Sequence, residues 1–209
     1  MSANAWLQLA IFLVVLLALV KPLGWYMAGV YLGQPCGLDR ALGWLERGLY
    51  RLAGVDPKSE MGWKTYAVAL LLFNGAGLLF LYALQRLQGI MSLNPQGLNG
   101  VPADLAFNTA ASFASNTNWQ NYGGESTLSY LTQMAGLGVQ NFVSAATGMA
   151  VLVVLIRGLA RRSTETIGNY WVDLVRSTLY ILLPLSLILA ILLVSQGDAR
   201  RLDDLQLGE

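Results

Sequence analysis

The sequence predicts an all-α integral membrane protein with four transmembrane helices, one re-entrant pore helix and a filter-like loop after it. Three observations predict this class. Apolar residues make up 55% of the 209 positions and charged residues only 12%, about half the charged fraction of an ordinary soluble domain. Four uncharged apolar runs are each long enough to cross about 30 Å of hydrocarbon. Between the second and third runs, a short apolar helix precedes a stretch of amides, hydroxyls and glycines.

The composition also excludes several classes of function. The chain has no histidine and a single cysteine, Cys36. A histidine-bearing catalytic triad, a Cys/His zinc site, a haem histidine ligand and a disulfide framework are therefore excluded. Thirteen basic and twelve acidic residues leave a net charge of +1, so there is no basic footprint for nucleic acid. Any site must be built from amides, hydroxyls, carbonyls and aromatic rings.

The four apolar runs predict the spans. They are Asn4–Val20, Thr65–Gln85, Tyr130–Ile156 and Ser177–Gln196. None contains a charged side chain, each of which would cost about 2.5 to 3.5 kcal/mol at mid-bilayer. The first run ends at Lys21-Pro22 and lacks the flanking features of a secretory signal, so we expect a retained anchor. Pro184 lies inside the fourth run, where it frees a carbonyl that a neighbouring group can satisfy, so we expect a kink rather than a break.

The basic residues predict the orientation of the spans. Lysines and arginines gather between the first and second runs and between the third and fourth, whereas Arg86 alone lies between the second and third. Because basic loops stay on the cytoplasmic side, both termini are expected outside. In the first basic connection, leucines recur every three or four residues from Leu38 to Leu52, which predicts a helix in the inner interface. That helix could be a docking surface for a partner subunit or a membrane-surface spacer, and the sequence favours the spacer.

The connection between the second and third runs is the most informative stretch. Pro102 and Asp104 begin a helix that is too short to span the membrane and too apolar to lie in water. A polar run follows it from Ser115 to Glu125. This order is typical of a re-entrant pore loop, whose unpaired backbone must be buried in protein or line a wet cavity. An amphipathic helix on the outer surface followed by a solvated loop is the alternative.

The third run adds a stripe of polar residues to this picture. Gln133, Gln140, Ser144 and Thr147 fall on one face of a helix. Such a stripe needs a protein or water surface to face. A packed bundle would explain the stripe alone, whereas a pore-lining helix behind the loop would explain the stripe and the loop together.

One polar string and several shorter motifs also carry a resemblance to a known family. The string is Ser115–Tyr122, and the motifs are Lys21–Gly24, Leu93–Gln96, Gly124-Glu125, Thr127–Tyr130, Gln133–Leu137, Gln140–Phe142, Ser144–Ala146 and Trp171–Leu174. Together they resemble the first selectivity-filter region of the potassium-binding A subunit of the Kdp-type potassium-transporting ATPase. The matching residues are spread over nearly the whole chain.

The resemblance implies a fold derived from potassium channels, with four units of span, pore helix and span around one pore. The expected organisation is an extra N-terminal transmembrane helix at 1–22, a cytoplasmic loop with an interfacial helix at 23–64, one complete span, pore-helix, filter and span repeat at 65–157, a second cytoplasmic loop at 158–176, the first helix of a second repeat at 177–196 and an outer tail at 197–209. Family members continue through three more filter segments, so a fragment or an incompletely encoded subunit is expected.

The resemblance also implies a function in the bacterial inner membrane. The complete A subunit would select potassium on the outer side and pass it to a P-type ATPase catalytic subunit, accompanied by small accessory subunits. ATP hydrolysis would belong to that partner, and no catalytic residue or organic cofactor is expected in this chain. The remaining filter repeats and the lipid bilayer would be its other partners. Two alternatives stay open: a stand-alone, homo-oligomeric potassium channel subunit, and a non-transporting helical membrane assembly protein.

The filter residues follow from the resemblance position by position. Asn116, Thr117, Asn118 and Trp119 would line the filter, mostly through backbone carbonyls, and Gln120 would lie at its outer edge and influence potassium affinity. Tyr122, Gly123, Gly124 and Glu125 would support the loop, and Glu125 could alternatively raise the local cation concentration. One filter strand supplies only a quarter of the carbonyl rings, so this chain alone is not expected to bind potassium selectively.

Overall fold

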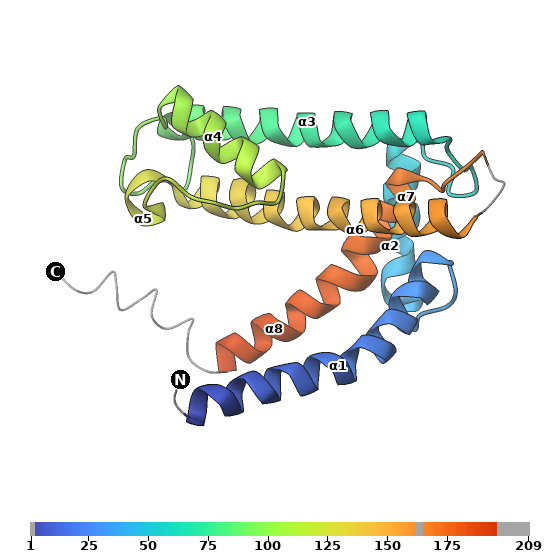
Figure 1. Ribbon diagram of the computed structural model, residues 1–209. Coiled ribbons are helices and arrows are strands. Elements are labelled where there is room, and N and C mark those ends of the chain that lie inside the picture. Colours follow the sequence, from blue (N-terminus) through green and yellow to red (C-terminus); the bar gives the residue numbers. More distant parts are fainter. Residues whose placement is uncertain (1–2, 162–164, 196–209) are drawn as a thin grey trace.

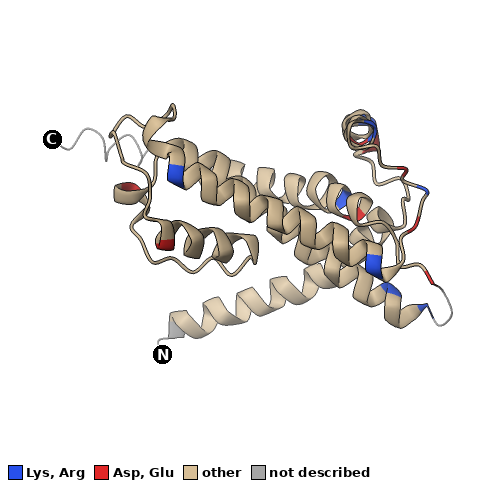
Figure 2. Ribbon diagram, turned by 90° about the horizontal axis from the view of Figure 1, so that it is seen from above, with Lys and Arg blue, Asp and Glu red and all other residues tan. Residues whose placement is uncertain are grey.

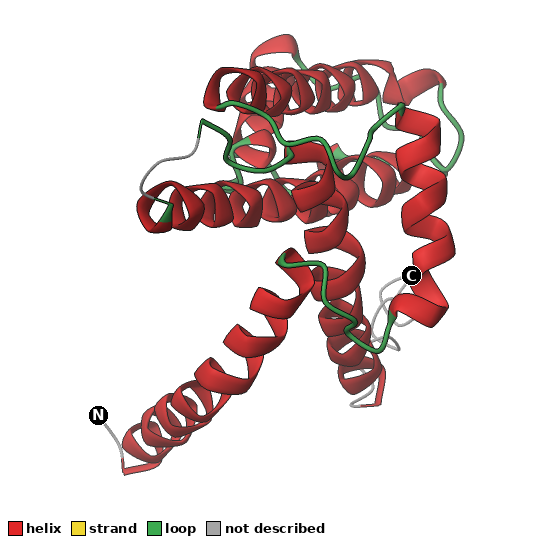
Figure 3. Cartoon of the chain, turned by 90° about the vertical axis from the view of Figure 1, so that its right-hand side faces the viewer, coloured by secondary structure: helices red, strands yellow, loops and turns green. Residues whose placement is uncertain are grey.

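The computed structural model describes residues 3–161 and 165–195, and these residues form helices joined by loops, without a strand (Figures 1 and 3). The elements are α1 (Ala3–Tyr31), α2 (Asp39–Ala53), α3 (Trp63–Leu87), the short turn η1 (Gln88–Ile90), α4 (Ala103–Ala114), α5 (Gly124–Thr127), the π-helical turn η2 (Thr132–Gly138), α6 (Val139–Ala160), α7 (Tyr170–Arg176), a second π-helical turn η3 (Ser177–Leu182) and α8 (Leu183–Ser195). The predicted outer tail, 197–209, lies outside the described residues.

Four helical stretches are long and apolar enough to cross a membrane, which confirms the predicted all-α membrane class. They are Asn4–Tyr31, Trp63–Ile90, Thr132–Ala160 and Tyr170–Ser195. At most 22% of the residues in any of their most apolar windows are buried inside the chain, and in the first stretch none is. The apolar side chains therefore face outwards, which a soluble protein avoids and a lipid-facing bundle requires.

The ends of two helices differ from the prediction. The first helix continues through Lys21 and Pro22 to Tyr31, because an internal proline removes one helical hydrogen bond without stopping the turns that follow it. The last apolar helix begins at Tyr170 instead of Ser177. The Asn169 side chain accepts hydrogen bonds from the backbone N–H groups of Trp171 (3.1 Å) and Val172 (3.5 Å), so it caps an earlier start.

An ion pair explains why α6 and α7 each contain a charged residue. Arg157 of α6 forms two hydrogen bonds with Asp173 of α7, at 2.6 and 2.9 Å. The Tyr66 hydroxyl of α3 donates to the same carboxylate at 3.1 Å. Gly168 has a φ of +112°, and its missing Cβ leaves room for the Arg157 guanidinium. A charge that is paired in this way does not have to leave the bundle, so the helices do not end there.

Pro184 does not break the last helix, which continues through α8 to Ser195. Proline has no N–H, so the carbonyl of Tyr180 loses its usual helical donor. The hydroxyl of Tyr26, from α1, donates to this carbonyl at 2.6 Å. A side chain from a neighbouring helix therefore satisfies the carbonyl that the proline frees.

The charged residues gather at one end of the bundle. Figure 2 shows most of the lysines, arginines and acidic residues at the end where α2 lies, and few at the end that carries α4 and α5 (Figures 1 and 2). This distribution defines a basic end and a polar, nearly uncharged end. The loop with the predicted filter residues connects α4 and α5, the helices that this second end carries.

Candidate functional site

The short helix α4 packs along α3 instead of standing apart from the bundle. Ala106, Ala110 and Phe113 of α4 are buried in one cluster with Leu81 of α3. The Gln85 side chain of α3 donates to the carbonyl of Ala106 at 3.1 Å. Figure 1 shows α4 running back beside α3, with the loop after it returning to α5. The sequence predicted this short helix, and its apolar face explains why it lies against a neighbour.

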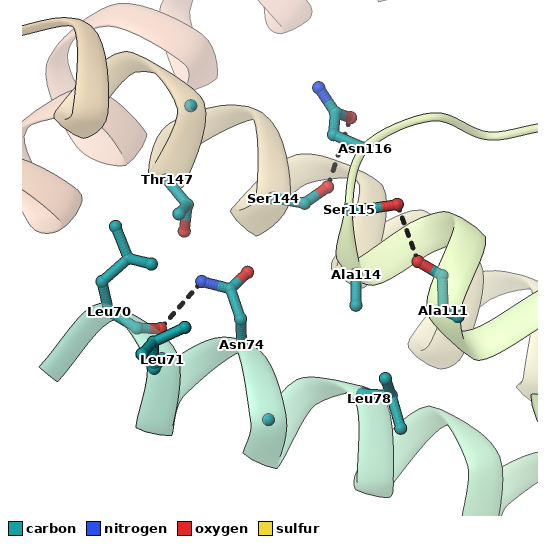
Figure 4. Close-up of a pocket in the computed structure, with 12 residues that line it drawn as sticks. Leu70, Leu71, Asn74, Leu78, Ala111, Ala114, Ser115, Asn116, Ser144 and Thr147 are labelled. Atoms are coloured by element: carbon teal, nitrogen blue, oxygen red, sulfur yellow. Dashed lines mark hydrogen bonds between the residues drawn. The ribbon is translucent and has the colours of Figure 1, made fainter. Parts of the chain in front are cut away.

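The loop after α4 reaches the middle of the third long helix. The Ser144 hydroxyl donates to Oδ1 of Asn116 at 3.2 Å, as Figure 4 shows. The Asn118 side-chain amide donates to Oδ1 of Asn141 at 2.6 Å. Ser144 lies twelve residues after Thr132, where the third long apolar stretch begins, a distance of roughly 15 to 18 Å along a helix. The tip of the loop is therefore level with the body of that helix and not beyond its end.

The backbone of the loop has an unusual conformation. Asn116 and Asn118 have positive φ angles, 57° and 53°, and all peptide bonds in the described residues are trans. Asparagine tolerates this left-handed region better than most side chains do. Three successive N–H groups point at the end of α4. The Asn116 N–H donates to the carbonyl of Phe113 (3.2 Å), and the Thr117 and Asn118 N–H groups donate to that of Ser112 (3.0 and 3.3 Å).

This pattern fixes the direction of three carbonyl groups. In a trans peptide the C=O of one residue points opposite to the N–H of the next. The carbonyls of Ser115, Asn116 and Thr117 therefore point away from the end of α4. No hydrogen bond between described residues ends on these three oxygens. Their dipoles continue the dipole of α4, whose negative pole lies at this end. Such oxygens can replace part of the hydration shell of a monovalent cation.

The predicted filter residues are not equivalent in the structure. The carbonyl of Trp119 accepts a hydrogen bond from the Ser112 hydroxyl at 2.9 Å, so it already has a protein partner. Its side chain is half exposed, and Gln120 is exposed. Ser115, which the sequence did not single out as a ligand, contributes one of the three free carbonyls.

The predicted supporting residues lie where the loop returns to α5. The carbonyl of Gly124 accepts a hydrogen bond from the Gln133 side chain at 3.2 Å. Tyr122 packs against the cluster around Leu81, and burial raises the pKa of its phenol. Gly123 and Glu125 flank the start of α5, where Glu125 is exposed.

Sequence reasoning missed two groups that hold the loop in place. Ser112 binds the loop through its carbonyl and its hydroxyl. Gln88, which is fully buried, donates to the carbonyl of Thr127 (2.8 Å) and accepts from the Ser129 N–H (3.1 Å). For Ser112, the available signal was a serine in the last turn of the short helix. Gln88 lies beyond the end of the predicted span, so no sequence pattern indicated its role.

A cleft of about 650 Å³ opens beside the tip of the loop. It is lined by α3, the end of α4 and α6, through Leu70, Leu71, Asn74, Gly75, Leu78, Ala111, Ala114, Ser115, Asn116, Ser144, Thr147 and Gly148 (Figure 4). Only part of the polar stripe predicted on the third span lines this cleft. Ser144 and Thr147 line the cleft, whereas Gln140 packs against Gly77 of α3 and Gln133 holds the return of the loop.

These features define a class of protein: a helical membrane protein in which a half-length helix and its return loop present free backbone carbonyls among longer helices. A family model described as Potassium-transporting ATPase A subunit matches residues 10–206. The chain belongs to this family. This confirms the family resemblance that the sequence motifs indicated.

Curated relatives support the same family. The potassium-transporting ATPase potassium-binding subunit of Sorangium cellulosum is 71% identical over 197 residues, which cover 94% of this chain and 34% of the relative. That of Herpetosiphon aurantiacus is 66% identical over the same shares. That of Chromobacterium violaceum is 58% identical over 206 residues, or 99% of this chain and 34% of the relative. The chain therefore spans about a third of the length of these relatives.

Proposed function

We propose that this chain contributes one cation-binding strand to the potassium-binding subunit of an ATP-driven potassium uptake complex. The observation that carries the proposal is the row of three free carbonyls at Ser115, Asn116 and Thr117, set at the negative end of α4. The family, and the names of the relatives as potassium-binding subunits, support potassium as the ion. The proposal adds the Asn118 carbonyl as the next member of this row and places Trp119 and Gln120 toward its mouth.

The proposal treats α4 and its loop as a re-entrant element that enters from the outer side of the bacterial inner membrane. The depth of Asn116 beside Ser144 supports this. In the proposed orientation the basic end lies in the cytoplasm and both termini lie outside. The repeat then extends over 63–160, and the first helix of the next repeat begins at Tyr170.

The proposed complex supplies what one strand cannot. Three further carbonyl strands of the complete subunit would close the ring around potassium. A P-type ATPase catalytic subunit would hydrolyse ATP and receive the ion, with small accessory subunits beside it in the membrane. The role of this chain is to dehydrate and hold the ion, and no organic cofactor is required for that step.

Two substitutions at Asn118 test the proposal in a complete subunit that carries this segment. Asn118→Val places a β-branched residue at a φ of 53°, which costs about 1 to 2 kcal/mol and turns the neighbouring carbonyls. Asn118→Gly removes the side-chain hydrogen bond to Asn141 but keeps the backbone conformation, because glycine adopts a positive φ readily. We expect the apparent KM for potassium uptake to rise roughly 5- to 30-fold for the valine variant, and less for the glycine variant.

The measurement is potassium uptake by cells that depend on this complex, with the amount of subunit in the membrane checked for each variant. A valine variant that takes up potassium with unchanged affinity would show that the conformation of this loop does not matter for the ion. The proposal would then be wrong.

A further inference from the structure

Helix α2 is held firmly against the basic end of the bundle. The carboxylate of Glu46 accepts hydrogen bonds from the hydroxyls of Tyr50 (2.8 Å) and Tyr180 (2.7 Å) and pairs with Arg176 (3.3 Å). Leu42 and Leu45 pack against the cluster that contains Tyr180. The position of α2 is therefore fixed by the fold and is not that of a loose linker.

Helix α2 also lies at the level where the long helices end. In Figure 1 it runs across the direction of α3 and α6, and Figure 2 shows it end-on. Its partners Arg176 and Tyr180 belong to the second and third turns of the long stretch that begins at Tyr170. A helix that crosses long apolar helices near their ends, and packs beside them, lies in the plane of a membrane interface.

The outward side of α2 carries two adjacent rows with different chemistry. Trp44, Gly48 and Leu52 repeat every four residues, and the side chains of Trp44 and Leu52 are 67% and 88% exposed. Arg40, Arg47 and Arg51 form the neighbouring row, since spacings of seven and four residues return to one helix face. All three arginines are exposed, and none makes an ion pair within residues 3–161 and 165–195.

We propose that α2 binds the surface of an anionic membrane leaflet, with Trp44 and Leu52 in the acyl boundary and the arginine row on phospholipid headgroups. Charge complementarity identifies the occupant, because three unpaired guanidinium groups beside an exposed apolar row match phosphate groups above hydrocarbon. The leucine pattern left two alternatives open, a docking surface for a partner subunit and a membrane-surface spacer. The proposal assigns the outward face of α2 to lipid instead of a partner subunit. The assignment does not depend on potassium binding.

The test places a spin label on the apolar row and measures whether the label lies in lipid or in water. The chain with Cys36→Ser and Leu52→Cys is purified and reconstituted into phosphatidylcholine vesicles, with or without phosphatidylglycerol. Ser59→Cys, in the exposed loop after α2, is the reference for water. In vesicles with phosphatidylglycerol we expect the label at position 52 to collide with oxygen and to be protected from a water-soluble nickel chelate. The label at 59 should show the reverse, and Trp44→Cys should behave as position 52 does.

Two matched pairs of substitutions distinguish the effect of the arginine row from the effect of the total charge of the chain. Arg47→Gln with Arg51→Gln removes two charges from α2, and Lys58→Gln with Lys64→Gln removes two from the adjoining segment. We expect the first pair to abolish the gain in protection that phosphatidylglycerol provides, a change of roughly 30-fold in the partition of the helix. The second pair should retain the gain.

Three results would overturn the assignment. The first is a label at position 52 that is as accessible to the chelate as the label at 59. The second is an equal effect of the two pairs of substitutions. The third is a label that meets water in vesicles but is shielded from both oxygen and chelate in cell membranes containing the whole complex, because that pattern identifies a protein partner.

Discussion

Two asparagines shape the candidate site at the scale of single residues. Asn116 and Asn118 adopt the left-handed conformation that directs the carbonyls, and their side chains tie the loop to Ser144 and Asn141 of α6. The sequence could single out this polar string as the candidate site. It could not predict which carbonyls are free, because that depends on where the N–H groups point, and Ser112 of a different element decides it.

At the mouth of the loop, Gln120→Arg tests the electrostatic part of the proposal. Gln120 is exposed, so an arginine can be accommodated there, and a fixed positive charge near the path of the ion repels it. A unit charge about 8 Å away contributes roughly 1 to 2 kcal/mol at intermediate dielectric, so we expect the apparent KM for potassium to rise roughly 5- to 30-fold in a complete subunit. Gln120→Leu serves as the uncharged control. Equal affinities for the arginine and leucine variants would contradict the prediction.

At the scale of elements, the existence of the helices follows from the sequence but their ends do not. The uncharged apolar runs, and the helix start at Pro102 and Asp104, are enough to find four long helices and one short one. The ends depend on contacts between distant residues, such as the pair of Arg157 with Asp173 and the cap that Asn169 forms on α7. A rule that stops a span at the first charge or proline cannot include these contacts.

The contact between α1 and the proline-containing helix leads to a thermodynamic prediction. Tyr26→Phe removes the donor to the Tyr180 carbonyl, and we expect a loss of about 0.6 to 1.7 kcal/mol in the free energy of unfolding. In a Pro184→Ala background the new backbone N–H can satisfy that carbonyl, so the loss should be smaller. The measurement is a double-mutant cycle, in which the free energy of unfolding of each variant is determined in mixed detergent.

A second tyrosine provides the control for this cycle. Tyr31 bonds to Ser177 through its hydroxyl at 2.7 Å, a contact that does not involve the proline. Tyr31→Phe should therefore cost the same with and without Pro184→Ala. A cycle with no coupling between positions 26 and 184 would show that the tyrosine does not compensate for the proline.

A surface contact at the basic end predicts a dependence on pH. Hydrogen bonds from Thr166 and Arg161 hold the pKa of Glu60 below its ordinary value of 4.5. A lowered pKa in the folded state stabilises the fold above the unfolded value, and the effect is lost as the pH falls through the folded value. Glu60→Gln should therefore lower the thermal midpoint slightly at pH 6, and the difference from the parent should shrink as the pH falls below 4.5 and through the lowered pKa of Glu60. A difference that is constant with pH would contradict this.

At the scale of the whole molecule, the candidate site is open on one side. The free carbonyls lie beside a cleft of about 650 Å³, and one row of oxygens cannot surround an ion. The long helices expose apolar surface along most of their length. Both features fit a chain that spans about a third of its relatives and whose site we propose to be completed by further strands.

The most direct test locates the ion in a complete subunit that carries this segment. Thallium(I) replaces potassium in many binding sites and scatters X-rays anomalously, so its position can be determined in crystals of the complex. We predict an anomalous peak in contact with the carbonyl oxygens of Asn116 and Thr117, reduced when potassium is added in excess. Anomalous peaks only elsewhere in the subunit, with these carbonyls facing lipid or bulk water, would contradict the account.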